Sequence, residues 1–213
     1  MAELLALMAC ALGSFLLGSI PWGVIVSEAF FHTDVREHGS GNIGTTNALR
    51  TMGKVGGGAV FLLDFGKGLA AGFVAWALAR LLVDPAGGFA FASFDVMKSL
   101  AFLGCVAGHI FSPWLGFKGG KGVAVAVGCL FVTFGPLLAL AEIAVFALVV
   151  ALSRHVPAGS IASACACVPC SLVAFWGQPL PVCLCSAAAV LVIWAHRCNI
   201  ERLRAHIEPR VGQ

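Results

Sequence analysis

Six long apolar blocks limit the possible folds of this chain more than any other feature of its sequence. They are separated by short polar stretches and cover approximately residues 3–27, 56–83, 96–114, 122–152, 159–176 and 180–196. A helix needs about 20 apolar residues to cross the hydrocarbon core of a bilayer. Charged residues make up only 11% of the chain, whereas soluble domains carry about 25%. The sequence therefore predicts an all-α polytopic membrane protein and argues against a water-soluble monomer.

The fourth block, residues 122–152, is too long for one ordinary span. Gly135-Pro136 lies near its middle and is typical of a turn followed by a helix start. Two short helices here, of about 13 to 17 residues, give seven spans, and ten of the thirteen Lys and Arg residues then lie in loops on one side. A single helix divides these charges evenly. Because positive charge collects on the cytoplasmic side, we expect seven transmembrane helices, with the amino terminus outside and the carboxyl terminus in the cytoplasm.

The rest of the composition fits one membrane domain without a cofactor. No soluble domain or internal repeat is visible, so residues 1–213 are expected to form a single integral membrane domain, with the first block retained as a span. The nine cysteines are expected to be free packing thiols, because their number is odd and nearly all lie in apolar runs. The spacing of Cys165, Cys167 and Cys170 suggests a metal site, but no histidine or carboxylate accompanies it, and no metal or cofactor is expected. The net charge of +3 indicates orientation in the membrane rather than nucleic-acid binding.

Four polar stretches lie on the cytoplasmic side in this topology, and the first is rich in hydrogen-bonding groups. It contains "GSGNIGTTNALR", which offers Ser40, Asn42, Thr46, Asn47 and Arg50 between three glycines. Glycines let backbone N–H groups approach an anion, and loops of this kind that lead into a helix form phosphate sites. Ser, Thr and Asn also suit turns and helix caps. The density of such groups beside an arginine favours an anion site.

The second polar stretch ends in "GFKGGKGVA". It places Lys118 and Lys121 around Gly119 and Gly120, with Gly122 leading into the next apolar block. Two ammonium groups and flexible backbone at a helix amino end favour phosphate binding. Lysines at a cytoplasmic helix end also fix orientation, but orientation alone requires no glycine cluster.

The other cytoplasmic residues have weaker signals. His196 and Asn199, in "AHRCNIERL", are candidates for a base and for groups that hold a substrate hydroxyl, although capping and interfacial roles are also open. Ser160 is a helix cap or a substrate contact. For His109, in "GHIFSPWLGF", helix packing or contact with the lipid interface is the simpler interpretation.

Three ionisable residues lie inside the apolar blocks. Asp64 and Lys67 are three residues apart, share a helix face and are expected to form an ion pair. Glu142 has no neighbouring partner in the sequence and requires one from another helix, or a proton. A charge at mid-bilayer costs about 2.5–3.5 kcal/mol, so none of the three is expected to face lipid.

Together these stretches indicate a site for more than one phosphate group at the membrane surface, without help from a metal. Two functions fit: chemistry on a phospholipid precursor, and transport of an organic phosphate or other anion. A transporter is typically built from paired halves that meet at mid-membrane. Here the polar residues gather at one face, which favours the enzyme.

The motifs "GSIPWG", "SGNIGTTNALR", "DFGKG", "GHIFSPWLGFKGGKGVA" and "HRCNIERL" resemble, in order and spacing, those of the PlsY family, the bacterial membrane acyl-phosphate:glycerol-3-phosphate acyltransferases. The resemblance runs from about residue 18 to residue 208, with small departures at Thr45 and His206. It implies transfer of an acyl group from a long-chain acyl phosphate to the sn-1 hydroxyl of glycerol 3-phosphate. The products are lysophosphatidic acid and phosphate, and acyl-CoA and acyl-carrier-protein are not donors. It also implies seven spans in the bacterial cytoplasmic membrane and a site that faces the cytoplasm.

The resemblance gives each candidate residue an expected role. Ser40, Arg50 and one of the two lysines, Lys121 or Lys118, are expected to hold the phosphate of glycerol 3-phosphate. The loop with the sequence "GFKGGKG", called the glycine-lysine loop below, is expected to bind the head group of the acyl phosphate.

The remaining roles concern the attacking hydroxyl and the surroundings of the site. Asn42, His196 and Asn199 are expected to orient the hydroxyl. Thr46, Asn47, Ser160 and Gly122 complete the expected substrate-binding set. Because an acyl phosphate is already activated, positioning and charge neutralisation supply most of the rate, and no acyl-serine intermediate is expected. The expected partners are the two substrates and membrane lipid, with no nucleic acid, and the chain is expected to be a monomer.

Overall fold

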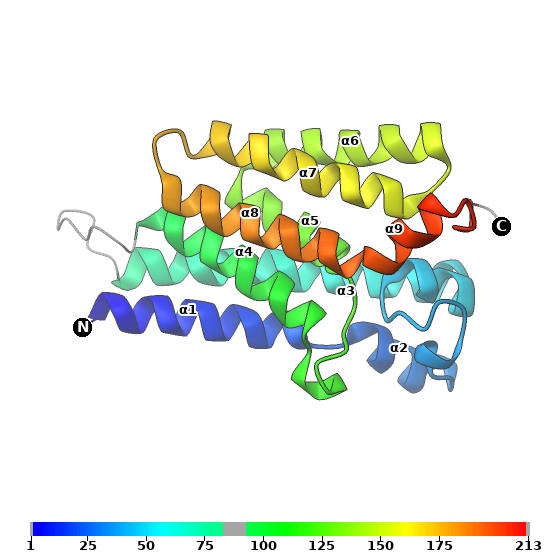
Figure 1. The fold of residues 1–213 in the computed structure, drawn as a ribbon. Helices are drawn as coiled ribbons and strands as arrows, with labels where there is room; N and C mark the ends of the chain where they lie inside the picture. Colours follow the sequence, from blue (N-terminus) through cyan, green and yellow to red (C-terminus); the bar gives the residue numbers. More distant parts are fainter. Residues whose placement is uncertain (1, 83–92, 212–213) are drawn as a thin grey trace.

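The fold is a long bundle of α-helices. The computed structural model describes residues 2–82 and 93–211, in which there is no β-strand. Its helices are α1 (Ala2–Ser19), α2 (Trp22–Phe31), α3 (Thr45–Leu82), α4 (Phe94–Ile110), α5 (Val123–Thr133), α6 (Pro136–Ser153), α7 (Val156–Ala174), α8 (Pro179–Ala195) and α9 (Arg197–Arg204). Figure 1 shows that the start of α1 and the end of α9 lie at opposite ends of the bundle. The prediction of an all-α fold is confirmed within the described residues.

The number of helices suited to cross a membrane is lower than the number predicted. Within the described residues, five segments are long and apolar enough, namely Glu3–Phe31, Thr45–Leu81, Phe94–Leu115, Pro136–Ser153 and Val156–Ala174. The pair α8 and α9, bent by 54°, makes a sixth if it is counted as one span. The fourth apolar block is divided where predicted, since α5 ends at Thr133 and α6 begins at Pro136. However, α5 has 11 residues and α6 has 18, so only the first of the two is short.

The short helix α5 packs deep in the bundle against α3. A Cβ atom on Gly68 of α3 would lie 2.1 Å from the carbonyl oxygen of Val125, and one on Gly128 of α5 would lie 2.0 Å from that of Phe65. Only glycine permits backbones to approach this closely, a device common in membrane helix pairs. The closeness of α3 and α5 fixes the position of Gly122, which begins α5 with a φ of 80°.

The nine cysteines are free, as predicted, and five of them are buried. Glu142 is buried in α6, and its Oε1 accepts no hydrogen bond from any residue that the structure describes.

Candidate active site

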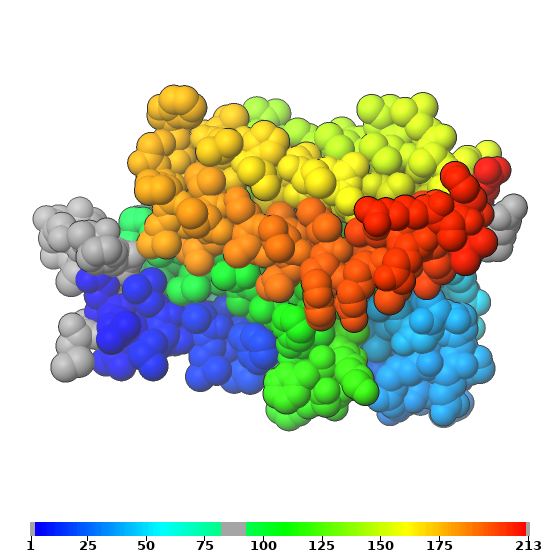
Figure 2. All heavy atoms as spheres, viewed as in Figure 1, coloured from blue at the N-terminus to red at the C-terminus, as the bar shows by residue number. Residues whose placement is uncertain are grey.

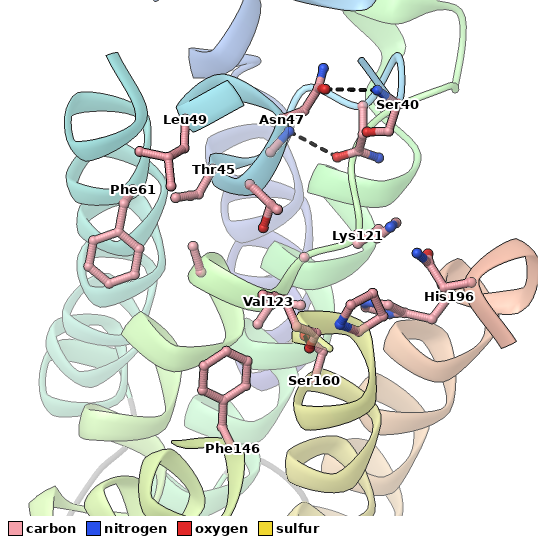
Figure 3. Close-up of a pocket in the computed structure, with 18 of the residues that line it drawn as sticks. Ser40, Thr45, Asn47, Leu49, Phe61, Lys121, Val123, Phe146, Ser160 and His196 are labelled. Carbon is pink, nitrogen blue, oxygen red and sulfur yellow. Dashed lines mark hydrogen bonds between the residues drawn. The ribbon is translucent and has the colours of Figure 1, made fainter. Parts of the chain in front are cut away.

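A cavity of about 750 Å³ lies at the end of the bundle where α2, the start of α3 and α9 meet (Figure 1). Its polar lining comes from the loop before α3 and the start of α3, the loop before α5 and the junction of α8 with α9, and it includes Ser40, Asn42, Arg50, Lys121, His196 and Asn199. Its apolar lining extends between the helices and includes Leu49, Phe61, Val127, Ile143, Phe146 and Val156. Figure 3 shows the loop that carries Ser40 on one side of the cavity, His196 on another, and Lys121 between them. One cavity thus has a polar end and an apolar end.

The loop before α3 is held in shape by the side chain of Asn47. Its Nδ2 donates to the carbonyl oxygens of Val35 at 2.8 Å and His38 at 3.0 Å. Its Oδ1 accepts from the backbone N–H of Ser40 at 2.9 Å (Figure 3). Asn47 is buried, and these three contacts use its whole amide group except one lone pair. It therefore positions Ser40 rather than offering a free amide to a ligand.

Two cations face the cavity without a carboxylate partner. Across residues 2–82 and 93–211, neither Arg50 nor Lys121 lies within ion-pair distance of an Asp or Glu. The pKa of Lys121 is lowered to about 8, mainly by burial; the charge of Glu208 opposes this shift, and the charges of Arg202 and Arg50 contribute to it. Cations without a carboxylate partner are suited to binding an anion.

The carboxyl-terminal segment, residues 205–211, closes one side of the cavity. Figure 2 shows this end of the chain (red) lying against the helices in yellow and near the light-blue segment. Glu208 lines the cavity, and its carboxylate accepts from Asn199 Nδ2 at 2.9 Å and from Arg202 Nε at 2.7 Å. The backbone N–H of Val211 donates to the carbonyl oxygen of Arg154 at 2.8 Å. Glu208 therefore fixes the orientation of the Asn199 amide.

His196 is buried where α8 meets α9, and its proton position follows from its contact. Its Nδ1 lies 2.8 Å from the carbonyl oxygen of Val192. A carbonyl oxygen only accepts, so Nδ1 carries the hydrogen and Nε2 of the neutral ring carries a lone pair. Such a nitrogen can accept a hydrogen bond, or a proton, from a hydroxyl group. Ser160, nearby in Figure 3, donates its own hydroxyl to the Val156 carbonyl at 3.1 Å.

The predicted ion pair of Asp64 and Lys67 is present, with 2.9 Å between Asp64 Oδ1 and Lys67 Nζ. Lys67 also contacts His109, at 3.0 Å from its Nδ1. All three side chains are buried, so the alternative that His109 faces the lipid interface is wrong.

Ten of the thirteen predicted site residues line the cavity. They are Ser40, Asn42, Thr46, Asn47, Arg50, Lys121, Gly122, Ser160, His196 and Asn199. Lys118, Gly119 and Gly120 do not line it, and Lys118 is exposed. The sequence did not indicate Glu208 as a cavity residue, although its position as an acid among several arginines is a usable signal.

Comparisons with known proteins point to the glycerol-3-phosphate acyltransferases. A family model described as glycerol-3-phosphate acyltransferase matches residues 8–206. A glycerol-3-phosphate acyltransferase of Thermosynechococcus vestitus is 44% identical over 209 residues, covering 95% of this chain and 93% of the relative. One from Synechococcus sp. (strain JA-3-3Ab) is 46% identical over 213 residues, covering 100% and 96%.

Two solved structures share the fold. The crystal structure of PlsY, an integral membrane glycerol 3-phosphate acyltransferase, in its glycerol 3-phosphate form has a TM-score of 0.82 and 32% identity, and the match covers 97% of this chain and 96% of that one. The lysophosphatidic acid form has a TM-score of 0.78 and 31% identity. Since the match extends over nearly the whole chain in sequence and in structure, this protein belongs to the PlsY family of integral membrane glycerol-3-phosphate acyltransferases.

Proposed function

We propose that the cavity transfers an acyl group from a long-chain acyl phosphate to the sn-1 hydroxyl of glycerol 3-phosphate, giving lysophosphatidic acid and phosphate. One observation carries the proposal. A single cavity is lined by two cations without a carboxylate partner among the described residues, by a histidine whose Nε2 is an acceptor, and by apolar side chains between helices. Phosphate groups fit the cations, and an acyl chain fits the apolar end.

The cations bind the phosphates in this proposal. Arg50 and Lys121, with the hydroxyl of Ser40, hold the phosphate of glycerol 3-phosphate. The backbone at Gly122 lies beside the head group of the acyl phosphate, whose chain extends past Phe61 and Phe146. Lys118 is exposed and outside the cavity lining, so Lys121 is the lysine assigned to phosphate binding.

The chemical step needs a positioned hydroxyl more than a strong base. Asn42 and Asn199 orient the glycerol, and His196 Nε2 accepts the hydrogen bond of the sn-1 hydroxyl. The hydroxyl oxygen bonds to the acyl carbon, the bond between that carbon and the phosphate oxygen breaks, and phosphate leaves with the electron pair. The hydroxyl proton passes through His196 to the departing phosphate. Charge on that phosphate is neutralised by the fixed cations, which favours the transition state.

The same proposal covers the orientation in the membrane. Residues 1–213 form one domain that crosses the bacterial cytoplasmic membrane seven times as a monomer, with α5 as a short crossing inside the bundle. The amino terminus is outside and the cavity opens to the cytoplasm. The distribution of Lys and Arg supports this, since ten of thirteen then lie on the cytoplasmic side.

The test of this function uses purified protein with palmitoyl phosphate and glycerol 3-phosphate. We expect release of phosphate together with formation of lysophosphatidic acid, and loss of both in Lys121→Ala. Counterflow of glycerol 3-phosphate in liposomes, with no phosphate release, would instead identify an anion transporter.

A further inference from the structure

A group of three buried ionisable side chains lies beneath the glycine-lysine loop. Asp64, Lys67 and His109 are 2%, 4% and 3% exposed. Lys67 Nζ lies 2.9 Å from Asp64 Oδ1, 2.7 Å from the carbonyl oxygen of Ile20 and 3.0 Å from His109 Nδ1. Asp64 and His109 also line the cavity, so the group reaches the proposed substrate site.

The contacts of Lys67 determine which nitrogen of His109 carries the hydrogen. An ammonium group has three donor hydrogens and no acceptor. Lys67, ion-paired with Asp64, therefore donates to the Ile20 carbonyl and to Nδ1 of His109, which must present a lone pair. The hydrogen of a neutral imidazole then lies on the other nitrogen. His109 is a donor through Nε2–H.

The Nε2 edge of His109 lies against the glycine-lysine loop. A Cβ atom on Gly120 would lie 2.1 Å from this nitrogen, so the ring can occupy its place only beside a glycine. The backbone N–H of Gly120 donates to the carbonyl oxygen of His109 at 3.0 Å, and the backbone N–H of Gly119 donates to the carbonyl oxygen of Ile110 at 2.9 Å. No residue in the described part of the chain accepts a hydrogen bond from Nε2. The loop glycines thus hold a donor at the cavity wall without supplying its acceptor.

The two histidines of the cavity have opposite tautomers. His196 donates through Nδ1 to Val192 and leaves Nε2 as an acceptor, which suits a hydroxyl group. His109 accepts through Nδ1 and leaves Nε2 as a donor, which suits an oxyanion. The Val192 carbonyl oxygen, which accepts from His196, and the Lys67 ammonium group, which donates to His109, set this difference.

We propose that His109 donates its Nε2–H to a phosphate oxygen of a substrate bound beside Lys121, and that Asp64 and Lys67 are positioning residues that hold this tautomer. The inference rests on the proposed function in taking the ligand to be a phosphate. A neutral donor strengthens an anion site at this depth without adding a third unpaired charge beside Arg50 and Lys121.

A matched pair of substitutions separates the donor role from a packing role. In His109→Asn, the amide lies near the position of Nδ1, so the contact with Lys67 is kept and the donor at the cavity is lost. In His109→Gln, the amide nitrogen lies near the position of Nε2, so the donor is kept and the contact with Lys67 is weakened. Detergent-solubilised variants are assayed with palmitoyl phosphate and glycerol 3-phosphate, and their melting temperatures are compared with that of the wild type.

We expect His109→Asn to raise one KM by about tenfold to a hundredfold, the usual effect of losing a hydrogen bond to a charged group. His109→Gln is expected to stay within about threefold of the wild-type KM. Whichever substrate shows the raised KM, glycerol 3-phosphate or palmitoyl phosphate, carries the phosphate that His109 contacts. A wild-type KM for both substrates in His109→Asn, or a larger defect in His109→Gln than in His109→Asn, overturns the proposal.

A second measurement does not depend on turnover or on the stability of the variants. Nitrogen-15 NMR of the histidine-labelled wild-type protein is expected to show hydrogen on Nε2 of His109 and none on Nδ1, with Nε2 shifting when inorganic phosphate is added. The double substitution Asp64→Asn with Lys67→Met removes both charges together, and the two tautomers should then mix. A hydrogen on Nδ1 in the wild type, or no response to phosphate, contradicts the inference. If phosphate moves Nε2 while the wild type shows no acyl transfer, the proposed function fails and the phosphate site stands.

Discussion

The two cations that line the cavity differ in how deeply they are buried. Arg50 is exposed and carries a permanent charge. Lys121 is half-buried, and that burial lowers its pKa to about 8. The two cations look equivalent in the sequence, yet only one of them loses its charge near physiological pH.

Binding of glycerol 3-phosphate should weaken above the pKa of Lys121. As the pH rises through about 8, Lys121 loses its proton and its attraction for phosphate. Above this pH, we expect KM for glycerol 3-phosphate to rise about tenfold per pH unit, since only the charged form of Lys121 binds the phosphate. Initial rates measured from about pH 7 to about pH 10 check this.

Lys121→Arg is the matched control, because a guanidinium keeps its charge throughout this range. The KM of this variant for glycerol 3-phosphate should be nearly independent of pH. If its KM rises with pH as steeply as that of the wild type, another group is responsible for the titration.

Loss of folded protein at high pH does not explain a rise in KM. Lysine titrates at 10.5 in the unfolded chain, so between about 8 and 10.5 the unfolded state binds more protons and the contribution of Lys121 to stability rises with pH.

Asn47 illustrates a residue whose role the sequence did not reveal. Asn47→Asp replaces the two donor contacts to Val35 and His38 with a carboxylate that faces two carbonyl oxygens. Each buried carbonyl left unpaired costs about 1–3 kcal/mol. We therefore expect a markedly lower melting temperature in detergent. Glu37→Gln, an exposed charge change in the same loop, should alter stability by less than about 0.5 kcal/mol. Equal melting temperatures for the two variants would refute the structural role of Asn47.

The sequence predicted site composition better than site geometry. Arg50, Lys121 and His196, which are far apart in the chain, meet in one cavity as expected. Residue type and glycine spacing were enough for that. The sequence did not indicate that Gly119 and Gly120 pack against His109 rather than line the cavity. That distinction depends on how close α4 lies to the loop, which no local pattern encodes.

At the scale of elements, proline and glycine set most helix boundaries. Gly135-Pro136 correctly predicted the break between α5 and α6. The first apolar block is one candidate span, Glu3–Phe31, as expected. Its helix is nevertheless interrupted before Trp22, because Pro21 lacks an N–H and disfavours helical backbone at the preceding residue. Gly53 interrupts α3 for a different reason: its φ of 70° and ψ of −167° lie outside the helical region and are accessible to glycine. An isolated glycine in an apolar run carries no sign of such a kink.

The contact between α3 and α5 should be very sensitive to added volume. Gly68→Ala brings a Cβ atom to within 2.1 Å of the Val125 carbonyl oxygen, and the helices must separate to accept it. Overpacking typically costs about 1–3 kcal/mol, and a clash with backbone belongs at the upper end. Thermal unfolding in detergent measures the loss, which should be accompanied by reduced activity because α5 begins directly after Gly122, which lines the cavity.

Gly66→Ala is the comparison within the same helix. A Cβ atom there has no atom within 4 Å, and alanine favours a helix over glycine by about 0.5–1 kcal/mol. This variant should be as stable as the wild type or slightly more stable. If Gly68→Ala behaves like Gly66→Ala, the close packing of α3 on α5 is incorrect.

At the scale of the whole molecule, the cavity has a polar end and an apolar end. Its polar residues gather at the end of the bundle that holds the loops, while Phe61, Ile143 and Phe146 continue its wall between the helices. A water-soluble phosphate and an acyl chain can therefore reach the same point by different routes. Charge counting and motif order indicated the polar end, whereas the apolar channel arises from packing of α3, α5, α6 and α7.

The orientation of this end can be tested with Cys198, an exposed free thiol in α9. If α9 faces the cytoplasm, a membrane-impermeant maleimide should label the protein in inverted membrane vesicles and not in intact spheroplasts. Labelling should disappear in Cys198→Ser, because the other exposed cysteines, Cys165 and Cys183, lie within helices α7 and α8 and are expected to face lipid.

Trp176→Cys in the Cys198→Ser background provides the opposite signal. Trp176 is 86% exposed in the turn between α7 and α8, at the far end of the bundle from α9 (Figure 1). It should react in spheroplasts and be protected in inverted vesicles. Labelling of both positions from the same side would contradict an odd number of crossings between these two points, and labelling of Cys198 from outside would place the cavity on the wrong face for a cytoplasmic substrate. The pair of thiols thus decides the orientation that the charge distribution only predicts.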